Sequence, residues 1–405
     1  MAEAVKALGE LQFIFWGFSC RIGLSLGPWA LLLRALNPFR RMTDILSIIK
    51  PSVRRVEAYT LKQLAAPIKI NQNENPFDMP EAIKAAVYRR MNEKAWSRYP
   101  AFVPSPLISK LADFSGWRSD GVLVGNGSNE LIEAILMVTV EKGKRVLVPQ
   151  PTFTLYKLLT IILGGECEEV FLTHALEFDI QKLLEATRQA DLTIICSPNN
   201  PTGSLITLSD LTSILKVTAG LVIVDEAYHE FSRQSVVPLL NDFENLIVLR
   251  TFSKAMAMAG LRVGYLLAHP RLVQEIAKAK LPYNLNIFSI AAAETAIEHF
   301  HLLQPQIDLI IQERERLYGQ MQNVPGLKAF PSQANFIAFE TSLDPMDVFK
   351  ALYADGILVR DVSRYPMLDK FLRVSVGSPA ENDRFLASLR KILKGAETFA
   401  YQPAD

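Results

Sequence analysis

The amino-acid sequence predicts an α/β fold in which helices cover a mostly parallel central sheet. Short runs that are apolar at consecutive positions recur through the middle of the chain, and such runs are typical of strands buried on both faces. Segments with helical periodicity separate these runs, as the connections of a parallel sheet require. The chain has 405 residues, of which 49% are apolar, so it can bury a large core and form more than one domain.

The first element with a clear pattern is the helix expected in "PEAIKAAVYRRM". Ile83, Val87 and Met91 are spaced four residues apart and therefore share one face of a helix. Pro80 stands just ahead of them, where the fixed backbone angle of proline suits a first turn. The pattern therefore predicts a helix with one buried face.

The strands and helices of the central layer follow in order. "GVLVGNGS" predicts a short strand that runs into a glycine turn, and the helix "SNELIEAILMV" comes next, with Ser128 or Asn129 placed to cap its N-terminus. The helical stretches further along include "LSDLTSIL" and "RLVQEIAKAK". Five further apolar runs predict strands: "RVLV" (145–148), "LTIIC" (192–196), "LVIVD" (221–225), "LIVLR" (246–250) and "VGYLLA" (263–268).

The pattern of predicted helices and strands changes after about residue 285. Long helical stretches lead to the short strands "NFIAFE", "ILVR" and "LRVSV", with the helices "PMDVFKALYAD" and "ENDRFLASLRKIL" beside them. We therefore expect residues 91–290 to form a large domain and residues 291–400 a smaller C-terminal α/β domain. Residues 43–90 are expected to form an N-terminal arm and part of the small domain, packed there or on a neighbouring subunit.

Residues 1–42 form an apolar extension that we expect to lie outside the fold. Its longest uncharged run, Ile22 to Leu33, has 12 residues, whereas a helix that spans a membrane needs about 20. No small-residue cleavage site follows a clean apolar core, so a signal peptide fits poorly. Three interpretations stay open: a segment that touches a membrane, a targeting extension, or residues upstream of a start at Met42.

Charge and cysteine usage argue against several classes of protein. The formal net charge of +1 argues against a protein whose main task is to hold nucleic acid or an acidic membrane. The three cysteines, Cys20, Cys167 and Cys196, form neither a disulfide framework nor a metal-ligand pattern, which fits a reducing cytosol. The five histidines show no ligand spacing, so no metal site is expected.

Four polar motifs follow predicted strands, at the edge of an open α/β sheet where ligands bind. "GNGSNE" follows "VLV", "SPNNPTG" follows "LTIIC", "DEAYHEF" follows "LVIV", and "TFSKAMAMAGLR" follows "LIVLR". Each has an ordinary explanation when taken alone, since "NNPTG" is a common turn sequence, Asp225 can cap a helix and Lys254 can be a solvated helix lysine. Their occurrence together on one edge of the sheet predicts a ligand site.

The order of the motifs resembles that of fold type I aminotransferases, which depend on pyridoxal 5'-phosphate (PLP). The motifs are GNGSNE, PTF, SPNNPTG, DEAY, TFSK with AGLR, and LRVSVG. Among them, "NENPF", "SRYP", "GNGSNELI" and "RTFSKAMAMAGLR" are similar to the histidinol-phosphate aminotransferase group. The resemblance covers nearly everything but the extension, and it implies a large PLP-binding domain followed by a smaller C-terminal domain.

Lys254 is the residue expected to form a Schiff base with PLP. An ordinary lysine has a pKa of about 10.4 and is charged at neutral pH. Burial among Ala255, Met256, Ala257 and Ala259, together with a nearby cation, would lower the pKa of this amine and make it a nucleophile. Once the substrate amine displaces it, Lys254 would act as general base and acid.

The resemblance also assigns residues around the ring of PLP. Asp225 would keep the pyridine nitrogen protonated, so that the cofactor can withdraw electrons. Tyr228 and Asn200 resemble the pair that hydrogen-bonds the phenolic oxygen. Phe153 resembles the aromatic residue that stacks on the ring, and its alternative is an ordinary core position.

A phosphate group needs backbone amides at a helix N-terminus, hydroxyls and an arginine. Ser128 and Asn129 would supply the amides, although the family usually has aspartate where Asn129 stands. Thr251, Ser253 and Arg262 would supply the rest, and Arg262 has the family's spacing from the lysine.

Tyr99, in "SRYP", resembles the tyrosine that reaches the phosphate from the partner subunit. The resemblance therefore implies a homodimer in which each active site is completed by the other chain.

Two arginines are candidates for binding the anionic groups of the substrates. Arg373 matches the arginine that grips the carboxylate of the amino acid, and Arg360 matches a second arginine near the distal acid; each can instead be a surface ion pair. A guanidinium group binds either a carboxylate or a phosphate by donating paired N–H hydrogen bonds. Phe77 stands where related enzymes often carry tyrosine, and Asn75 and Asn335 are further pocket candidates.

The resemblance, together with the absence of disulfide-forming cysteines, implies a cytoplasmic aminotransferase of histidine biosynthesis. It would interconvert L-histidinol phosphate and 2-oxoglutarate with imidazole-acetol phosphate and glutamate. A phosphothreonine decarboxylase and an aromatic amino-acid aminotransferase remain alternatives. A regulator with this fold would need a DNA-binding domain or would lack the lysine, and neither feature is seen.

Overall fold

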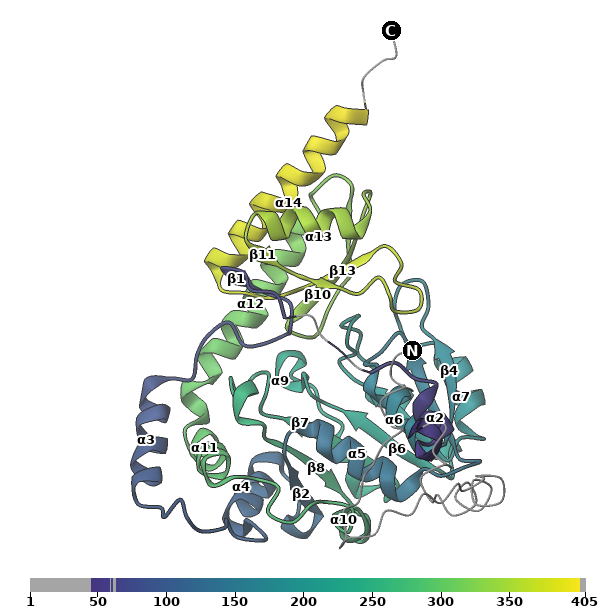
Figure 1. Ribbon diagram of the computed structural model, residues 1–405, viewed down its shortest axis with the longest axis vertical. Coiled ribbons are helices and arrows are strands. Elements are labelled where there is room, and N and C mark those ends of the chain that lie inside the picture. Colours follow the sequence, from purple (N-terminus) through teal and green to yellow (C-terminus); the bar gives the residue numbers. More distant parts are fainter. Residues whose placement is uncertain (1–44, 59, 61–62, 401–405) are drawn as a thin grey trace, which may run out of the picture. The chain divides into compact units, whose positions relative to one another are not determined.

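The computed structural model describes residues 45–58, 60 and 63–400, and the apolar extension expected at residues 1–42 lies outside this part of the chain (Figure 1). The described end of the first of two units contains one 3-10 turn, η2 (Ile45–Ile48). All other elements belong to the second unit, which begins at Pro51. Among the described residues, no helix is both long and apolar enough to cross a membrane.

A seven-stranded sheet forms the centre of the larger layer. Its strands from β7 to β4 are parallel, whereas β8 runs antiparallel to both of its neighbours. All six apolar runs of the sequence are strands here. In spatial order the strands are β2 (Val122–Gly125), β8 (Gly264–Ala268), β7 (Leu246–Thr251), β6 (Leu221–Asp225), β5 (Leu192–Cys196), β3 (Arg145–Gln150) and β4 (Glu166–Phe171).

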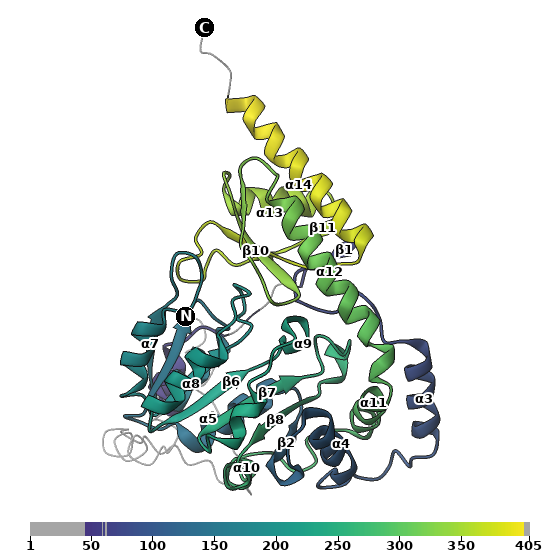
Figure 2. The same cartoon turned by 180° about the vertical axis from the view of Figure 1, so that it is seen from behind.

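Helices cover both faces of this sheet (Figures 1 and 2). β6 shows why the central strands are apolar at every position, because Val222 and Val224 pack into one core cluster and Ile223 packs into the cluster on the other face. Each such buried side chain stabilises the fold by about 1.5–3 kcal/mol. The helices of the Ile223 face are α5 (Ser128–Thr139), α6 (Leu155–Leu163) and α10 (Pro270–Ala277). Those of the other face are α3 (Glu81–Asn92), α4 (Ser105–Ser115), α7 (Ile180–Thr187), α8 (Leu208–Val217) and α11 (Ile287–Glu298).

The start of α5 differs from the expectation that Ser128 or Asn129 caps it. The N-cap position is Gly127, with a φ of 79°, and no side chain caps the helix. Only a residue that tolerates positive φ fits there, so the helix begins directly at Ser128. The carboxylate of Glu130 instead turns back and accepts a hydrogen bond from the backbone N–H of Asn126.

A second, antiparallel sheet forms the smaller layer. Its helices, α12 (Gln304–Met321), α13 (Pro345–Ala354) and α14 (Pro379–Ala400), bury their apolar faces against it in a separate core cluster. The strands are, in spatial order, β12 (Arg360–Asp361), β13 (Phe371–Ser375), β10 (Phe336–Thr341) and β9 (Leu327–Ala329).

The N-terminal segment joins this smaller layer through a two-stranded parallel pair, β1 (Ile68–Lys69) with β11 (Ile357–Leu358). The predicted strand "ILVR" is therefore divided between two sheets, because β12 follows β11 after one residue. α3 and α11 share the core cluster of the larger sheet and contact each other.

The remaining described elements are short. They are α2 (Pro51–Arg54), η3 (Ser119–Gly121), α9 (His229–Ser232), η4 (Val237–Asn241), η5 (Ala259–Leu261) and η6 (Phe300–Leu302).

Candidate active site

The polar motifs of the sequence meet at a cavity of about 270 Å³ beside the carboxyl ends of β5, β6 and β7. This is the edge at which ligands bind in open α/β sheets. The structure thus brings together twelve of the predicted site residues, which line the cavity: Ser128, Asn129, Phe153, Asn200, Asp225, Tyr228, Thr251, Ser253, Lys254, Arg262, Arg360 and Arg373.

Lys254 lies in the turn that follows β7, and its amine faces the cavity. Its Nζ donates a hydrogen bond to the backbone oxygen of Gln72 at 3.0 Å. Burial lowers the pKa of this amine to about 8, and the positive charges of Arg373 and Arg262 act in the same direction, opposed by Glu74. At neutral pH the uncharged, nucleophilic form of Lys254 is therefore far more populated than that of an ordinary lysine.

Asp225, the last residue of β6, is a buried carboxylate at the cavity wall. Its Oδ2 accepts a hydrogen bond from the Tyr156 hydroxyl at 2.7 Å, and its Oδ1 accepts one from the backbone N–H of Ala227 at 3.0 Å. Burial raises the pKa of Asp225, while these two donors lower it. Tyr228 lies three residues on, and its hydroxyl accepts a hydrogen bond from Asn73 Nδ2 at 3.0 Å.

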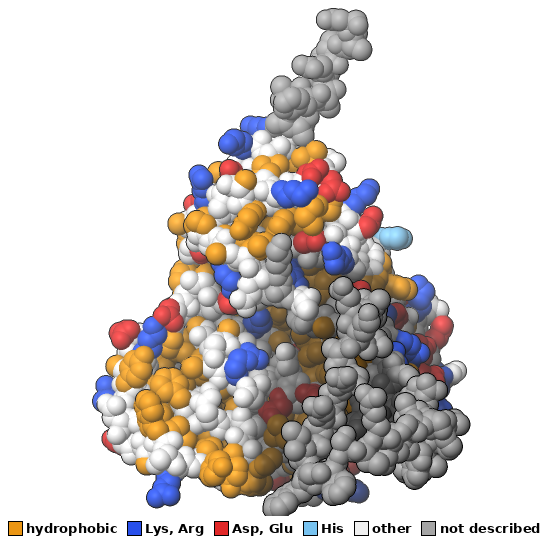
Figure 3. Space-filling view, in the orientation of Figure 1, with side chains coloured by type: hydrophobic (Ala, Val, Ile, Leu, Met, Phe, Trp, Pro, Cys, Tyr) orange, Lys and Arg blue, Asp and Glu red, His pale blue; other side chains and the backbone are white. Residues whose placement is uncertain are grey.

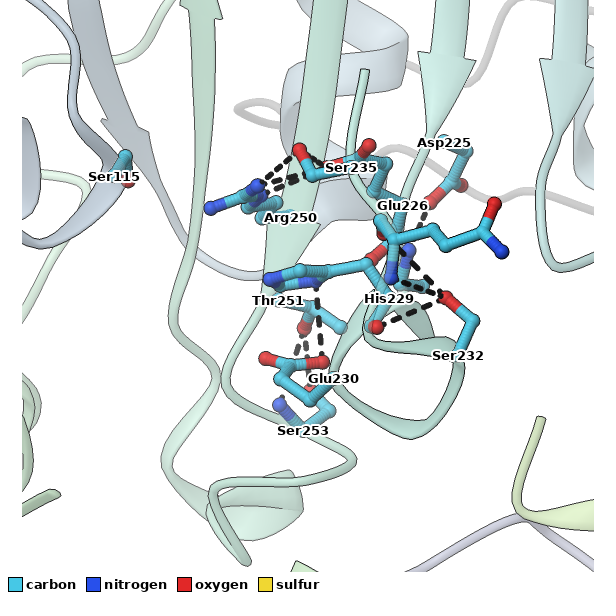
Figure 4. Close-up of polar contacts among 12 residues, drawn as sticks. Ser115, Asp225, Glu226, His229, Glu230, Ser232, Ser235, Arg250, Thr251 and Ser253 are labelled. Atoms are coloured by element: carbon cyan, nitrogen blue, oxygen red, sulfur yellow. Dashed lines mark hydrogen bonds and ion pairs between the residues drawn. The ribbon is translucent and has the colours of Figure 1, made fainter. Parts of the chain in front are cut away.

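A buried ion pair holds the turn that carries Asp225 and Tyr228 (Figure 4). Arg250 Nε donates to Glu226 Oε2 at 2.9 Å, and its Nη2 donates to the Ser235 hydroxyl at 2.7 Å. The side chains of Glu226 and Arg250 are only 2% and 6% exposed, so removing either partner would leave the other charge buried without compensation. The pair thereby anchors Glu226, the residue next to Asp225, to the neighbouring strand β7.

An anion-binding corner lies at the other end of the cavity. α5 begins there at Ser128 without a side-chain cap, so its first backbone N–H groups and its positive dipole end point outward. The Ser253 hydroxyl accepts hydrogen bonds from Thr251 Oγ1 at 3.0 Å and from Arg262 Nη1 at 3.1 Å. A Cβ atom at Gly127 would lie 2.4 Å from Arg262 Nη2, so glycine is what allows the guanidinium to reach the helix start.

Two arginines of the smaller sheet form the opposite wall. Arg373 and Arg360 are register partners on β13 and β12, and both line the cavity. Arg373 is buried, donates to Asn200 Oδ1, and also donates to the backbone oxygen of Asn71 at 2.9 Å. A guanidinium fixed in this way presents a planar donor fork to an anion.

Four residues that the sequence offered as site candidates do not line this cavity: Asn75, Phe77, Tyr99 and Asn335. Asn75 Nδ2 donates to the backbone oxygen of Ala255 at 3.1 Å, and its Oδ1 accepts from the backbone N–H of Phe77 at 2.9 Å, so both residues brace the loop beside the lysine. Tyr99 is 81% exposed and stacks on Tyr283 at 4.6 Å. Asn75 and Phe77 line a pocket that shares Ser253 with the cavity, whereas Tyr99 lines a separate pocket that shares none of the cavity's residues.

Several residues of the wall were not predicted from the sequence. The segment from Asn71 to Asn73 lines the cavity, and Asn335 holds it there through a hydrogen bond from Nδ2 to the backbone oxygen of Asn73 at 3.1 Å. Tyr156 and Tyr365 were also missed. The clustered asparagines of "NQNENPF" were a usable signal, whereas neither tyrosine stands in a distinctive motif.

The residues present fit PLP. An amine with a lowered pKa, a buried carboxylate and an anion-binding corner lie on separate walls of one cavity. These are the groups required by an aldehyde, a pyridine nitrogen and a phosphate on one rigid molecule.

Comparisons with known proteins agree with this chemistry. Residues 65–389 match the family of class I and II aminotransferases. The chain is 40% identical, over 87% of its length and 99% of the relative, to a histidinol-phosphate aminotransferase of Chlorobium phaeovibrioides, and 37% identical to one of Prosthecochloris aestuarii, with coverage of 86% and 99%. The histidinol-phosphate aminotransferase of Sinorhizobium meliloti, solved in complex with PLP, shares the fold, with a TM-score of 0.78, 24% identity, and coverage of 88% of this chain and 100% of that one.

These findings confirm the fold class, the aminotransferase activity and the PLP cofactor predicted from the sequence. The chain belongs to the class I and II aminotransferases and, among them, to the histidinol-phosphate aminotransferase family.

Proposed function

We propose that the protein transfers the amino group of L-histidinol phosphate to 2-oxoglutarate, which yields imidazole-acetol phosphate and glutamate in histidine biosynthesis. The observation that carries this proposal is the pair of guanidinium groups, Arg373 and Arg360, on one wall of a cavity whose other walls fit the cofactor. Two adjacent forks can bind the phosphate of one substrate and the carboxylates of the other.

PLP supplies an electron sink when it is bound. Lys254 would hold the cofactor covalently, because its lowered pKa leaves more of the free amine uncharged and nucleophilic than in an ordinary lysine. Once released, Lys254 moves a proton to and from the substrate carbon as general base and acid. Asp225 would keep a proton on the pyridine nitrogen, Tyr228 and Asn200 would donate hydrogen bonds to the phenolic oxygen, and Phe153 would supply the aromatic group beside the ring.

The anion-binding corner holds the cofactor phosphate. The backbone amides of Ser128 and Asn129, the hydroxyls of Thr251 and Ser253, and the guanidinium of Arg262 supply its donors. Asn129 serves through its backbone, so the aspartate common in the family is not required for this role.

A panel of amino donors tests the substrate. Purified protein is incubated with 2-oxoglutarate and with L-histidinol phosphate, phenylalanine, tyrosine or phosphothreonine, and glutamate and carbon dioxide are measured. We expect the highest kcat/KM for histidinol phosphate and no carbon dioxide. A preference for phenylalanine or tyrosine would make it an aromatic aminotransferase, and carbon dioxide from phosphothreonine would make it a decarboxylase.

The lowered pKa of Lys254 predicts how cofactor uptake depends on pH. Only the uncharged amine attacks the aldehyde, so the rate constant for PLP uptake by ligand-free protein should rise with pH and level off above about 8. Stopped-flow absorption from pH 6 to 11 measures it. A rate that still climbs towards pH 10.5, the ordinary value for lysine, would show that the amine is not desolvated.

We also propose that the protein is a homodimer in which Tyr99 contacts the cofactor phosphate of the partner subunit. Tyr99 is exposed and lies outside the cavity of its own chain, in a region with other exposed aromatic residues, including Trp96, Phe102 and Tyr283. Figure 3 shows hydrophobic side chains gathered over the neighbouring α3. Exposed apolar patches of this kind mark protein interfaces.

Replacing Tyr99 with phenylalanine should weaken PLP binding by about tenfold, because one hydrogen bond to a charged group is lost. The dissociation constant is measured by fluorescence titration of ligand-free protein, with Tyr353→Phe, on α13 of the smaller layer, as the matched control. An unchanged affinity, or a monomer in sedimentation, would refute the contribution of Tyr99.

We place the reaction in the cytoplasm. The two cysteines of the described chain, Cys167 and Cys196, are free thiols, as expected in a reducing compartment.

A further inference from the structure

We propose that Tyr156 is a positioning residue for the cofactor: its hydroxyl holds Asp225 in place and keeps that carboxylate ionised. This inference rests on the proposed role of Asp225 at the pyridine nitrogen. Tyr156 reaches Asp225 from α6, on a different element of the sheet layer, at 2.7 Å. The side chain is completely buried, so its hydroxyl cannot exchange this partner for bulk water.

The geometry leaves one part of the Asp225 carboxylate for the cofactor. The side chain accepts two hydrogen bonds from described residues, one on each oxygen, from Tyr156 and from the backbone N–H of Ala227. A carboxylate has lone pairs for about four hydrogen bonds, and Asp225 also lines the cavity. The two protein donors therefore fix the carboxylate plane while the cavity side stays accessible.

The chemistry of the donor is as important as its position. Asp225 is buried beside Cys196, its register partner on β5. Burial away from water disfavours the ionised form of the Asp225 carboxyl group. A neutral phenol stabilises the anion through a hydrogen bond but adds no positive charge. A histidinium or guanidinium in the same place would compete with the pyridinium for Asp225. Tyr156 thus favours the ionised carboxylate and leaves its charge for the cofactor.

The ring of Tyr156 also contacts the proposed stacking residue. Phe153 lies edge-on to it, with ring centroids 5.6 Å apart and an angle of 84° between the planes. Phe153 lines the cavity from the loop before α6. One side chain therefore supports both the carboxylate at the edge of the cofactor ring and the aromatic group on its face.

The test replaces Tyr156 with phenylalanine, which keeps the ring and removes the hydroxyl. The dissociation constant of PLP is measured on ligand-free protein by fluorescence titration between pH 5 and 9. We expect affinity to fall by about 10- to 100-fold at pH 7.5, since a buried hydrogen bond to a charged group is lost. The acid limb of the affinity profile should move to higher pH, because the carboxylate loses a donor that favours its ionised form. A purely structural defect would weaken binding equally at every pH.

Two further variants separate the possible outcomes. Tyr353→Phe removes a tyrosine hydroxyl that donates to the backbone oxygen of Ala65 at 3.2 Å, outside the cavity, and should leave the profile unchanged. Asp225→Asn should weaken binding by itself, and adding Tyr156→Phe to it should have little further effect. If Asp225→Asn leaves binding intact, the proposed role of Asp225 is wrong. If Asp225→Asn weakens binding but Tyr156→Phe neither weakens it nor shifts the acid limb, only the inference about Tyr156 is overturned.

Discussion

Replacing Lys254 with alanine is expected to abolish transamination, with kcat reduced by about 10⁴-fold or more. Alanine removes both the covalent attachment of the cofactor and the group that moves the substrate proton. Glutamate formation from histidinol phosphate and 2-oxoglutarate measures the effect. The variant should still bind PLP reversibly, because Asp225 and the anion-binding corner are intact, so dialysis should strip the cofactor from it more readily than from the unaltered protein.

Lys144 provides the matched control for this substitution. It forms an ion pair with Asp191 at 3.0 Å, just before β3 and thus at the end of the sheet away from the cavity. Partly exposed ion pairs contribute little to stability, so Lys144→Ala should keep its activity within about twofold. Near-normal turnover by Lys254→Ala would overturn the assignment of the whole site.

Replacing Arg373 with alanine should lower kcat/KM for glutamate by about 10²- to 10³-fold, because a fixed, buried guanidinium fork is lost. Arg373→Lys should have a kcat/KM for glutamate between those of Arg373→Ala and the unaltered protein. An ammonium group keeps the charge but cannot make two parallel hydrogen bonds. The affinity for PLP should change much less than kcat/KM in both variants. Comparing the loss of kcat/KM for glutamate with that for histidinol phosphate then shows how much each substrate depends on Arg373.

Arg373 also donates to Asn71 and Asn200, so thermal unfolding must accompany these kinetics. Arg390→Ala is a suitable control, because Arg390 lies on α14 and contacts only Gln320 among the hydrogen bonds of the described residues, at 3.2 Å. A wild-type kcat/KM for glutamate in a folded Arg373→Ala protein would exclude this arginine as the carboxylate ligand.

The features that could be predicted from the sequence are those determined by residues within a single helix, strand or turn. Central strands are apolar at every position because both faces are buried, as β6 shows, and six of the seven strands of the larger sheet were therefore evident. β4 was missed because "ECEEVF" carries three glutamates on the edge of the sheet, where side chains remain partly exposed. The Ser128 or Asn129 cap was wrong because a glycine with positive φ starts the helix instead.

The parts that could not be predicted depend on distant contacts. Tyr156 stands in an apolar helix where burial alone explains it, and nothing local indicates that its hydroxyl meets Asp225, 69 residues along the chain. Glu226 directly follows β6 and Arg250 lies on the neighbouring strand β7, 24 residues along the chain, so their pairing emerges only in the folded protein.

The segment from Asn71 to Asn73 has a consequence for how the protein is made. Its Asn73 side chain accepts a hydrogen bond from Ser375, 302 residues later, while Gln72 accepts one from Lys254. Contacts of such long range form late, because the closure of a large loop must precede them. A nascent chain therefore has no complete cofactor site until residue 375 has left the ribosome. Because only the finished fold binds PLP in this way, an excess of the vitamin-derived cofactor will draw newly made chains towards the native state by mass action.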